Sequence, residues 1–413
     1  MRTVGIVVEY NPFHNGHRYH LEQSVRASGA DAVVAVMSGH FLQRGEPALI
    51  DKWARTEMAL AGGCDLVIEI PIAYATNAAE WFAFGAASLL DATGVIDAIS
   101  FGSESGDIGV LRRIAAVLAN EPPQLQLMIQ GELATGASYP AAFSRAVRGF
   151  LAAAGDAEAA EFPLEQPNNT LGLHYLIALN RLGSPIAPYT IRREKAGYSQ
   201  RDVTDGSIAS ATALRRLIME SGDPASIASY VPESTLDILR REWQSGRAPI
   251  GWPSFADKLF HALAVNDPAS LAEFRDIGEG LEHRIKQALP RLAGLGFDSL
   301  IDAVKTKRYT RTRLQRALLS VLLGHRKAEL APNRLAQGIT YIRVLGFTAK
   351  GRALLKRMRT AAKLPILLSA ASPPIASRYL ELDTQASAAY ALGYSGPNPR
   401  DLFRDYLEPP IIR

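Results

Sequence analysis

The chain has 413 residues, of which 47% are apolar and 21% are charged, and its formal net charge is +4. This length exceeds one ordinary domain, and the apolar fraction is normal for a soluble globular protein. Cys64 is the only cysteine, which excludes an internal disulfide and fits a cytoplasmic location. The apolar stretch at residues 82–103 contains Asp91 and Asp97, whose charges would be costly in lipid, so no membrane span is expected.

Strands and helices alternate in the predicted structure of the first half of the chain. Short β-branched and apolar runs predict strands over residues 3–10, 31–37, 65–70 and 98–101. Helical patterns separate them, over residues 17–26, 53–61 and 79–90. Such alternation indicates a parallel sheet with right-handed crossovers, whose ligands bind beyond the carboxyl ends of the strands. We therefore expect a binding rim at residues 10–14, 38–44, 70–74 and 102–104.

The rest of the chain is predicted to divide near Ser221-Gly222-Asp223-Pro224. Residues 106–165 are rich in alanine and predict a helical insertion, whereas residues 185–193 predict a further strand and residues 210–220 a helix. From about residue 225 the pattern is almost wholly helical, with no clear strand alternation. We expect a Rossmann-like α/β domain over residues 1–222, with the insertion at about 106–165, and a mainly helical, basic domain over residues 223–413.

Positive charge is concentrated in the second of these domains. Residues 301–365 hold sixteen Lys and Arg against Asp302 and Glu329, which favours a polyanionic partner. Six of these cations surround Tyr309, a ring that could stack on an unpaired base: Lys305, Lys307, Arg308, Arg311, Arg313 and Arg316. A solvated basic helix is the alternative reading. Other cations are expected to extend the same surface: Arg343, Arg352, Lys356, Arg357 and Arg359.

The motif His14-Asn15-Gly16-His17 stands between the first predicted strand and the first helix. The beginning of a helix offers unpaired N–H groups and partial positive charge to a phosphate, and Gly16 permits close backbone approach. Two imidazoles at positions i and i+3 can face one side of the first turn and donate hydrogen bonds to a reacting α-phosphate. The alternative is that both histidines are capping or surface residues. The position after the first strand favours nucleotide chemistry.

A second, partial motif precedes the predicted domain boundary. HIGH-type nucleotidyltransferases carry a signature close to Ser-Ser-Thr-x-x-Arg, and here Ser210-Ala211-Thr212-Ala213-Leu214-Arg215 is similar, with Ala211 in place of one serine. Arg215 could reach the β- and γ-phosphates. Taken alone, the segment favours an ordinary helix capped by Ser210 or Thr212 with a solvated arginine.

The opening Gly5-Ile6-Val7-Val8-Glu9-Tyr10-Asn11-Pro12-Phe13-His14-Asn15-Gly16-His17 closely resembles the tRNA(Met) cytidine acetate ligase family. Further similar segments follow along nearly the whole chain: Ser38-Gly39-His40-Phe41-Leu42-Gln43-Arg44-Gly45-Glu46-Pro47-Ala48, Ser100-Phe101-Gly102-Ser103-Glu104, Gln166-Pro167-Asn168-Asn169-Thr170-Leu171-Gly172, Lys305-Thr306-Lys307-Arg308-Tyr309 and Tyr341-Ile342-Arg343-Val344-Leu345-Gly346-Phe347. One departure is His40, where the family usually has Asn.

The resemblance implies an enzyme that joins acetate to ATP and passes the acetyl group from acetyl-adenylate to N4 of the wobble cytidine in elongator tRNA(Met). The expected catalytic residues are His14 and His17. ATP is expected to bind together with Mg²⁺. Its expected contacts are Val7, Val8, Glu9, Tyr10, Asn11, Pro12, Phe13, His14, Asn15, Gly16, His17, Arg18, Tyr19, His20, Gly102, Asn168 or Asn169, Arg192 and Arg193. Either asparagine could instead cap a helix. The expected tRNA contacts are Lys305, Lys307, Arg308, Tyr309, Arg311 and Arg313.

Several other polar residues have simpler interpretations. Arg44 lies on the predicted rim and could hold acetate or pyrophosphate, although a loop turn with a charge pair is the alternative. Lys52 and Arg55 are expected to be surface charges on a helix, and Asp65 and Glu69 to be strand-end or surface groups. The spacing of His, Cys, Asp and Glu does not suggest a structural metal site.

Two alternative functions remain open from the sequence. One is a HxGH adenylyltransferase or acyl-adenylate ligase that acts on a small molecule and does not need the basic domain. The other is a non-catalytic RNA-binding protein.

Overall fold

The computed structural model describes residues 1–120, 122–193, 209–306 and 309–413. Within these ranges the chain forms one eight-stranded sheet in the order β5-β4-β1-β2-β3-β6-β7, with β8 paired to β6. Five neighbouring strands are parallel: β1 (Thr3–Val8), β2 (Ala32–Ser38), β3 (Leu66–Ile70), β4 (Ala98–Ser103) and β5 (Ala187–Arg192). The predicted α/β fold with a parallel sheet is therefore confirmed.

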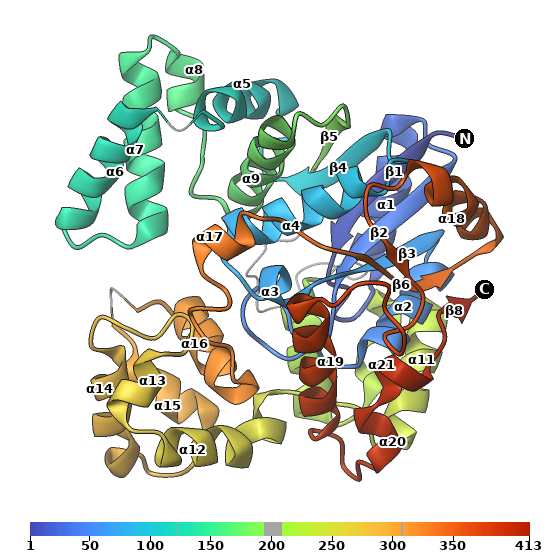
Figure 1. Cartoon of the computed structure of the whole chain (residues 1–413), viewed down its shortest axis with the longest axis vertical. Helices are drawn as coiled ribbons and strands as arrows, with labels where there is room; N and C mark the ends of the chain where they lie inside the picture. The colour runs from blue at the N-terminus through green and yellow to red at the C-terminus, as the bar shows by residue number, and fades with distance from the viewer. Residues whose placement is uncertain (121, 194–208, 307–308) are drawn as a thin grey trace.

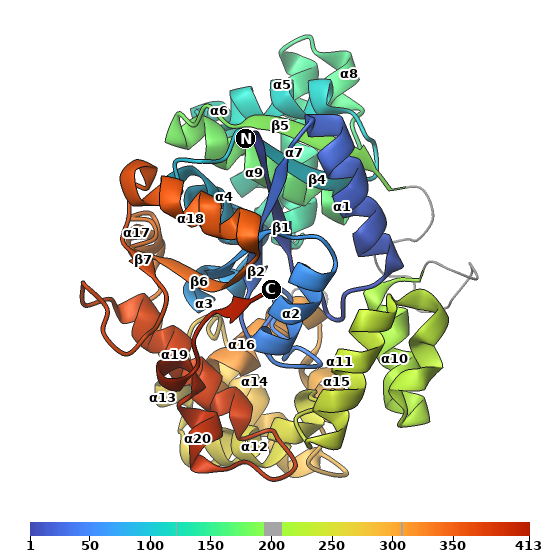
Figure 2. The same cartoon turned by 90° about the vertical axis from the view of Figure 1, so that its right-hand side faces the viewer.

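Helices cover both faces of this sheet (Figures 1 and 2). The crossover helices of the first half are α1 (Asn15–Ser28), α2 (Lys52–Ala61), α3 (Ile72–Ala75), α4 (Ala79–Ala92) and α9 (Pro167–Leu182). Neighbouring residues of β2 point to opposite faces, because side chains alternate along a strand. Val34 and Val36 accordingly join one core cluster, whereas Val33 and Met37 join the other.

The expected helical insertion is present between β4 and α9. It comprises α5 (Ile108–Leu118), α6 (Pro123–Ala134), α7 (Tyr139–Ala153) and α8 (Ala157–Ala160). Figure 1 shows these helices at one end of the molecule, with α6 and α7 projecting away from the sheet. After β5 the chain continues through α10 (Ala211–Ser221), the 3-10 turn Pro224–Tyr230 and α11 (Glu233–Gln244).

The second half is mainly helical, but the expectation that it contains no strand is wrong. Strand β6 (Ile342–Phe347) pairs antiparallel with β3, and two short strands, β7 (Ile366–Leu367) and β8 (Ile411–Ile412), pair with β6. All six residues of β6 are buried. A short, fully buried strand lacks the alternation of a half-exposed one, so periodicity does not separate it from a helix.

The helices of the second half form two groups. Five helices precede β6 in a cluster at the lower left of Figure 1: α12 (Ala256–Val265), α13 (Pro268–Ala272), α14 (Leu281–Ala288), α15 (Phe297–Val304) and α16 (Arg311–Leu323). The others come just before β6 or after it in the chain: α17 (Pro332–Leu335), α18 (Ala349–Ala361), α19 (Arg378–Ala391), α20 (Pro399–Leu402) and α21 (Arg404–Leu407). None of the described helices has the length and apolar character that a bilayer-crossing segment needs.

Buried charges connect the C-terminal helices to the sheet, and they correct the expectation that Lys52 is a surface residue. Lys52 is fully buried, and its Nζ lies 2.8 Å from carboxylate oxygens of both Glu69 and Asp405. Burial opposes the charge, but the two carboxylates outweigh it and raise the pKa of Lys52. Glu69 lies at the end of β3, as one expectation had it, but it is buried and is not a surface group.

Arg55 is likewise buried rather than exposed. Its guanidinium donates to backbone carbonyls at the ends of the first two strands, at 2.7 Å to Glu9 O and 3.0 Å to Ser38 O, and also to Gly39 O. The helix predicted over residues 53–61 is confirmed as α2. The polar residues at its beginning, however, face the carboxyl edge of the sheet. They therefore organise the backbone of the binding rim.

Candidate active site

The turn from β1 to α1 places His14 and His17 together. His14 is the residue before the first turn of α1, and its Nδ1 accepts a hydrogen bond from Gly16 N at 3.1 Å. The backbone N–H of His14 in turn donates to Nδ1 of His17 at 3.3 Å. The two rings stack with their centroids 3.7 Å apart. The motif thus caps its own helix, so the capping and functional interpretations are compatible.

The hydrogen bond from Gly16 N fixes the protonation pattern of the His14 ring. A neutral imidazole whose Nδ1 accepts a hydrogen bond carries its proton on Nε2. Burial lowers the pKa of His14 to about 3, with the cations Arg193 and Arg215 acting in the same direction. Burial also lowers the pKa of His17 well below its usual value, and the adjacent His14 contributes. Near neutral pH, each ring is therefore an uncharged hydrogen-bond donor.

A cavity of about 390 Å³ opens beside these rings at the carboxyl edge of the sheet. Its size falls in the usual range for small-molecule sites. Thirteen of the residues expected to contact ATP line it: Val7, Val8, Glu9, Tyr10, His14, Gly16, His17, Tyr19, His20, Gly102, Asn168, Arg192 and Arg193. The ends of β1, β4 and β5 and the beginnings of α1 and α9 are thus brought to one place.

Six expected ATP contacts do not line this cavity: Asn11, Pro12, Phe13, Asn15, Arg18 and Asn169. The Asn11 side chain accepts from Leu49 N at 2.7 Å and shapes the turn. Phe13 is fully buried and lies close to Gly62. Arg18 is on another side of α1, where it pairs with Glu22 at 3.0 Å. These six residues lie outside the cavity lining, and their contacts with ATP stay predictions.

Asn168 and Asn169 have different positions, although the sequence did not separate them. Asn168 lines the cavity, and its Oδ1 accepts from Arg193 Nη1 at 3.0 Å. Asn169 is buried, and its Oδ1 accepts from the backbone N–H groups of Glu104 and Ser105 at 3.0 and 3.2 Å. The Glu104 carboxylate accepts from Asn168 and Asn169 in return. Asn169 therefore holds the loop after β4, while Asn168 faces the cavity.

Arg215 lies at the edge of this site. Ser210 caps α10 by accepting from Ala213 N at 3.1 Å, so the capping interpretation holds for Ser210. Arg215 Nη1 donates to Asn11 O at 3.0 Å, and Nη2 lies 3.2 Å from a Glu46 carboxylate oxygen. These contacts place its charge next to the β1–α1 turn, although its side chain does not line the cavity.

Eight cavity residues were not expected as ATP contacts: Gln43, Phe82, Phe101, Leu171, Tyr175, Ile191, Ala209 and Ser210. Gln43 lies on the predicted rim, where its N–H donates to Glu9 Oε1 at 2.8 Å, and burial raises the pKa of Glu9. The apolar members come from α4, β4, β5, α9 and the residues just before α10. In the sequence these apolar residues look like ordinary core residues. Only the folded structure shows that they come together at the carboxyl edge of the sheet and form one wall of the cavity.

The proposed tRNA contacts are less uniform than their sequence suggests. Lys305 is exposed, whereas Lys307 and Arg308 lie outside the described residues. Tyr309 is buried, and its hydroxyl donates to Glu279 O at 2.7 Å, so the expectation that this ring stacks on a base does not fit its environment. Arg311 pairs with Asp298, and Arg313 lies 3.0 Å from Glu279.

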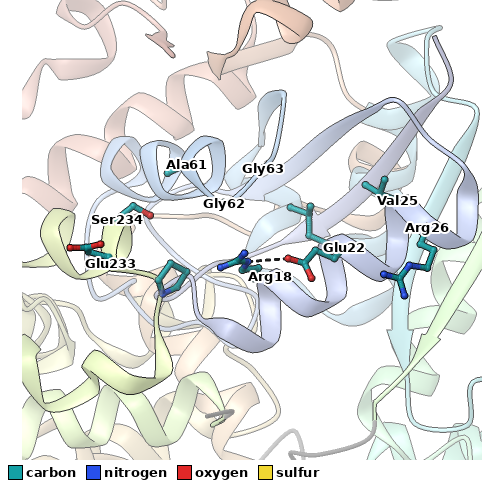
Figure 3. Close-up of a pocket in the computed structure, with 11 residues that line it drawn as sticks. Arg18, Glu22, Val25, Arg26, Ala61, Gly62, Gly63, Glu233 and Ser234 are labelled. Carbon is teal, nitrogen blue, oxygen red and sulfur yellow. Dashed lines mark hydrogen bonds and ion pairs between the residues drawn. The ribbon is translucent and has the colours of Figure 1, made fainter.

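A second, more open groove lies along another side of α1 (Figure 3). Its walls are Arg18, Leu21, Glu22, Val25 and Arg26 of α1, residues 61–63 after α2, and Pro232, Glu233 and Ser234 at the beginning of α11. The figure shows Arg18 turned toward Glu22. Neither histidine of the motif reaches this groove, so it is separate from the candidate active site.

Comparisons with known proteins agree with this geometry. The model of the HIGH Nucleotidyl Transferase family matches residues 1–404. A tRNA(Met) cytidine acetate ligase of Acetivibrio thermocellus is 39% identical over 100% of both chains. The protein of that name from Caldanaerobacter subterraneus subsp. tengcongensis is 42% identical, over 95% of this chain and 96% of its own.

Solved structures of similar chains have the same fold. The crystal structure of Thermotoga maritima TmcAL bound with alpha-thio ATP superposes with a TM-score of 0.90 at 35% identity, covering 100% of this chain and 99% of that one. The apo form of the same protein gives a TM-score of 0.92 at 36% identity, with the same coverage.

Proposed function

The chain belongs to the HIGH nucleotidyl transferase family and, within it, to the tRNA(Met) cytidine acetate ligases, and from that premise we propose how its own residues carry out ATP-dependent tRNA acetylation. The observation that carries the proposal is the stacked pair His14 and His17 at the beginning of α1, beside a nucleotide-sized cavity. Binding of an ATP analogue by a solved relative supports ATP as the occupant.

In the first step, an acetate oxygen attacks the α-phosphorus of ATP. The new O–P bond forms as the bond to the pyrophosphate oxygen breaks, giving acetyl-adenylate and pyrophosphate. The Nε2–H groups of His14 and His17 donate to the α-phosphate oxygens, where negative charge is held in the transition state. Because these rings are neutral and already hydrogen-bonded through Nδ1, they need little reorganisation as the reaction proceeds.

In the second step, N4 of the wobble cytidine attacks the acetyl carbonyl. The N–C bond forms, the bond from the carbonyl carbon to the phosphate oxygen breaks, AMP leaves, and N4 loses a proton. Apolar side chains along one wall of the cavity keep bulk water from the mixed anhydride. The apolar wall that includes Phe82, Phe101 and Tyr175 supports this role.

Magnesium is proposed to accompany the triphosphate rather than occupy a site built by the protein. Among the described residues, no group of three His, Cys, Asp or Glu side chains is arranged to hold a metal ion. Nearby carboxylates are engaged by other partners, as Glu46 is by Arg215 and Glu104 by Asn168 and Asn169. Mg²⁺ commonly binds through substrate phosphates and retained waters, and no step above depends on it.

The part of the chain at residues 223–413 is proposed to bind tRNA, with residues 1–222 as the nucleotidyltransferase domain. Of the six cations around Tyr309 in the sequence, Lys305, Lys307 and Arg308 are proposed to bind tRNA phosphates. Arg311 and Arg313 are proposed to assist only if they exchange their acidic partners for RNA. The partner is the tRNA(Met) that the relatives' names specify.

The direct test is to mix the protein with ATP, labelled acetate and total tRNA, and then to analyse the nucleosides. Label in N4-acetylcytidine of elongator tRNA(Met) is expected. Label in a small molecule would instead favour the small-molecule ligase, and no acetate-dependent chemistry together with tRNA binding would favour a non-catalytic RNA-binding protein.

The role of the motif is tested by changing His17 to Ala. Loss of its hydrogen bond to the α-phosphate should slow acetate-dependent ATP–pyrophosphate exchange by about 10²- to 10³-fold, with tRNA affinity nearly unchanged. His261→Ala is the matched control, because His261 is exposed on α12. Equal exchange rates in the wild type and His17→Ala would refute the assigned role.

A further inference from the structure

Helix α18 carries a row of exposed positive charge. Its sequence contains Lys350, Arg352, Lys356, Arg357 and Arg359 and no acidic residue, and all five side chains are exposed. Arg352, Lys356 and Arg359 are spaced i, i+4 and i+7, so they follow one side of the helix. Like charges at this spacing repel one another, and the row is therefore maintained at some cost to helix stability.

This row is not neutralised by neighbouring residues, unlike the basic helix α16. On α16, Arg311, Arg313 and Arg316 lie beside Asp298, Glu279 and Asp276. Over the ranges that the structure describes, no carboxylate lies within ion-pair distance of the three α18 cations. The nearby Asp91 is paired with Lys363, at 2.6 Å. Among these six cations, those of α16 thus have carboxylate neighbours and the three of α18 do not.

The position of α18 is fixed by close packing. Thr348 caps the helix and donates to Asp65 Oδ1 at 2.9 Å. Gly351 lies so close to the amino end of β3 that an added Cβ would be 1.9 Å from Asp65 O. Leu354 and Met358 are buried in the core. The cations are therefore presented on a rigid element at the amino edge of the sheet.

The length of helix α4 gives the distance between the amino edge of the sheet, where α18 lies, and the active site. Phe82, near its beginning, lines the nucleotide cavity, whereas Asp91, near its end, contacts Lys363 just after α18. Nine residues of α-helix span roughly 14 Å, and the width of α18 adds several ångströms. A ligand that reaches both places must extend over roughly 20 Å, which requires a macromolecule with regularly spaced negative charge.

Building on the proposed function, we infer that Arg352, Lys356 and Arg359 bind the phosphate backbone of a helical arm of the substrate tRNA, at a distance from the base that is acetylated. Phosphate contacts orient a nucleic acid without reading its sequence. The surface therefore positions the tRNA, while recognition of the cytidine belongs to the cavity. Figure 1 shows α18 at the upper right of the molecule and α16 at the lower left, so the two basic helices contact different parts of an RNA.

The test is charge reversal of the row in the full-length protein, with Arg352→Glu, Lys356→Glu and Arg359→Glu combined. The dissociation constant for elongator tRNA(Met) should rise at least about tenfold, and the slope of log affinity against log salt should become shallower by about 2 to 3. A charge-conserving variant, with Arg352→Lys, Lys356→Arg and Arg359→Lys, should retain most of the affinity. Acetate-dependent ATP–pyrophosphate exchange without tRNA should be the same in all variants, which also reports correct folding.

The matched control reverses two exposed cations on other helices, Arg112→Glu on α5 and Lys258→Glu on α12, and should change the salt slope less. An unchanged tRNA affinity and slope in the triple variant would overturn the inference. So would loss of binding to anionic phospholipid vesicles with tRNA binding intact, because the row would then serve a membrane surface. Failure of exchange in the wild type would instead count against the proposed function.

Discussion

At the scale of single residues, several histidines have a pKa far below the usual value. Burial lowers the pKa of His14 to about 3 and that of His20 to about 4, with Arg193 contributing to both. Away from the site, burial lowers the pKa of His174 to about 4 and that of His325 to about 3. These rings are neutral donors or acceptors in the folded protein over the whole physiological range. The cavity thus favours a charge-neutral pair of imidazoles facing an anionic ligand.

The first prediction concerns pH. Each of these histidines has a pKa in the folded protein below the usual value of about 6.5. Between the two pKa values, the unfolded chain therefore binds more protons than the folded chain. Stability is fully present above about pH 6.5 and is lost as the pH falls toward the folded pKa. A histidine shifted as far as His14 should make the protein about 2 kcal/mol less stable at pH 5 than at pH 8.

Urea unfolding at several pH values measures this loss, and NMR signals of the imidazole rings identify the groups. The His14 and His20 signals of the folded protein should not titrate between pH 5 and 8. The same protein unfolded in urea is the control, because its histidines should titrate near pH 6.5. A His14 signal that moves with a midpoint near 6.5 in the folded protein would contradict the buried, neutral assignment.

At the scale of elements, close backbone approach decides where α18 sits. The N–H of Thr348 donates to Asp65 O at 2.9 Å, and the same carbonyl faces Gly351. A side chain at position 351 would meet backbone atoms, which do not rotate away as a flexible side chain does. The helix and β3 therefore depend on one glycine for their contact.

The second prediction is that Gly351→Ala destabilises the protein by about 1 to 3 kcal/mol, the usual cost of forcing extra atoms into a packed contact. Gly131→Ala is the matched control, since Gly131 is also within a helix, is exposed, and has nothing near the position of an added Cβ. That variant should be neutral or up to about 1 kcal/mol more stable, because alanine favours helix. Denaturant unfolding compares them, and equal effects of the two substitutions would contradict the close approach.

At the scale of the whole molecule, the two halves of the sequence share one sheet and one buried charge cluster. Strand β6 extends the sheet beyond β3. Lys52 contacts Glu69 of the first half and Asp405 of the second, and Arg343 Nη2 donates to Asp405 O at 3.1 Å. Removal of the second half would expose the edge of β3 and leave this cluster incomplete. The predicted boundary near residue 222 therefore does not mark an independent structural unit in the sheet.

The third prediction compares two lysines in ion pairs. Lys52→Met should destabilise the protein by about 3 to 5 kcal/mol, because it leaves buried carboxylates without their cation. Lys363→Met should cost less than about 1 kcal/mol, because Lys363 pairs with Asp91 at the surface. Chemical denaturation gives both values, and limited proteolysis should show earlier cleavage near residue 405 in Lys52→Met alone. Similar costs for both substitutions would argue against a desolvated cluster.

The sequence by itself determined the parallel sheet, the order of its first strands, the helical insertion, and the HxGH turn, because each depends on local patterns of apolar residues, glycine and proline. Family resemblance supplied the chemistry. Only the tertiary structure decided which asparagine faces the cavity, that Lys52 and Arg55 are buried, and that β6 enters the sheet. It also separated the neutralised cations of α16 from the uncompensated row on α18. These outcomes depend on partners outside the local pattern, as far as 353 positions apart for Lys52 and Asp405, and no local pattern records which carboxylate or carbonyl folding will bring to a given side chain.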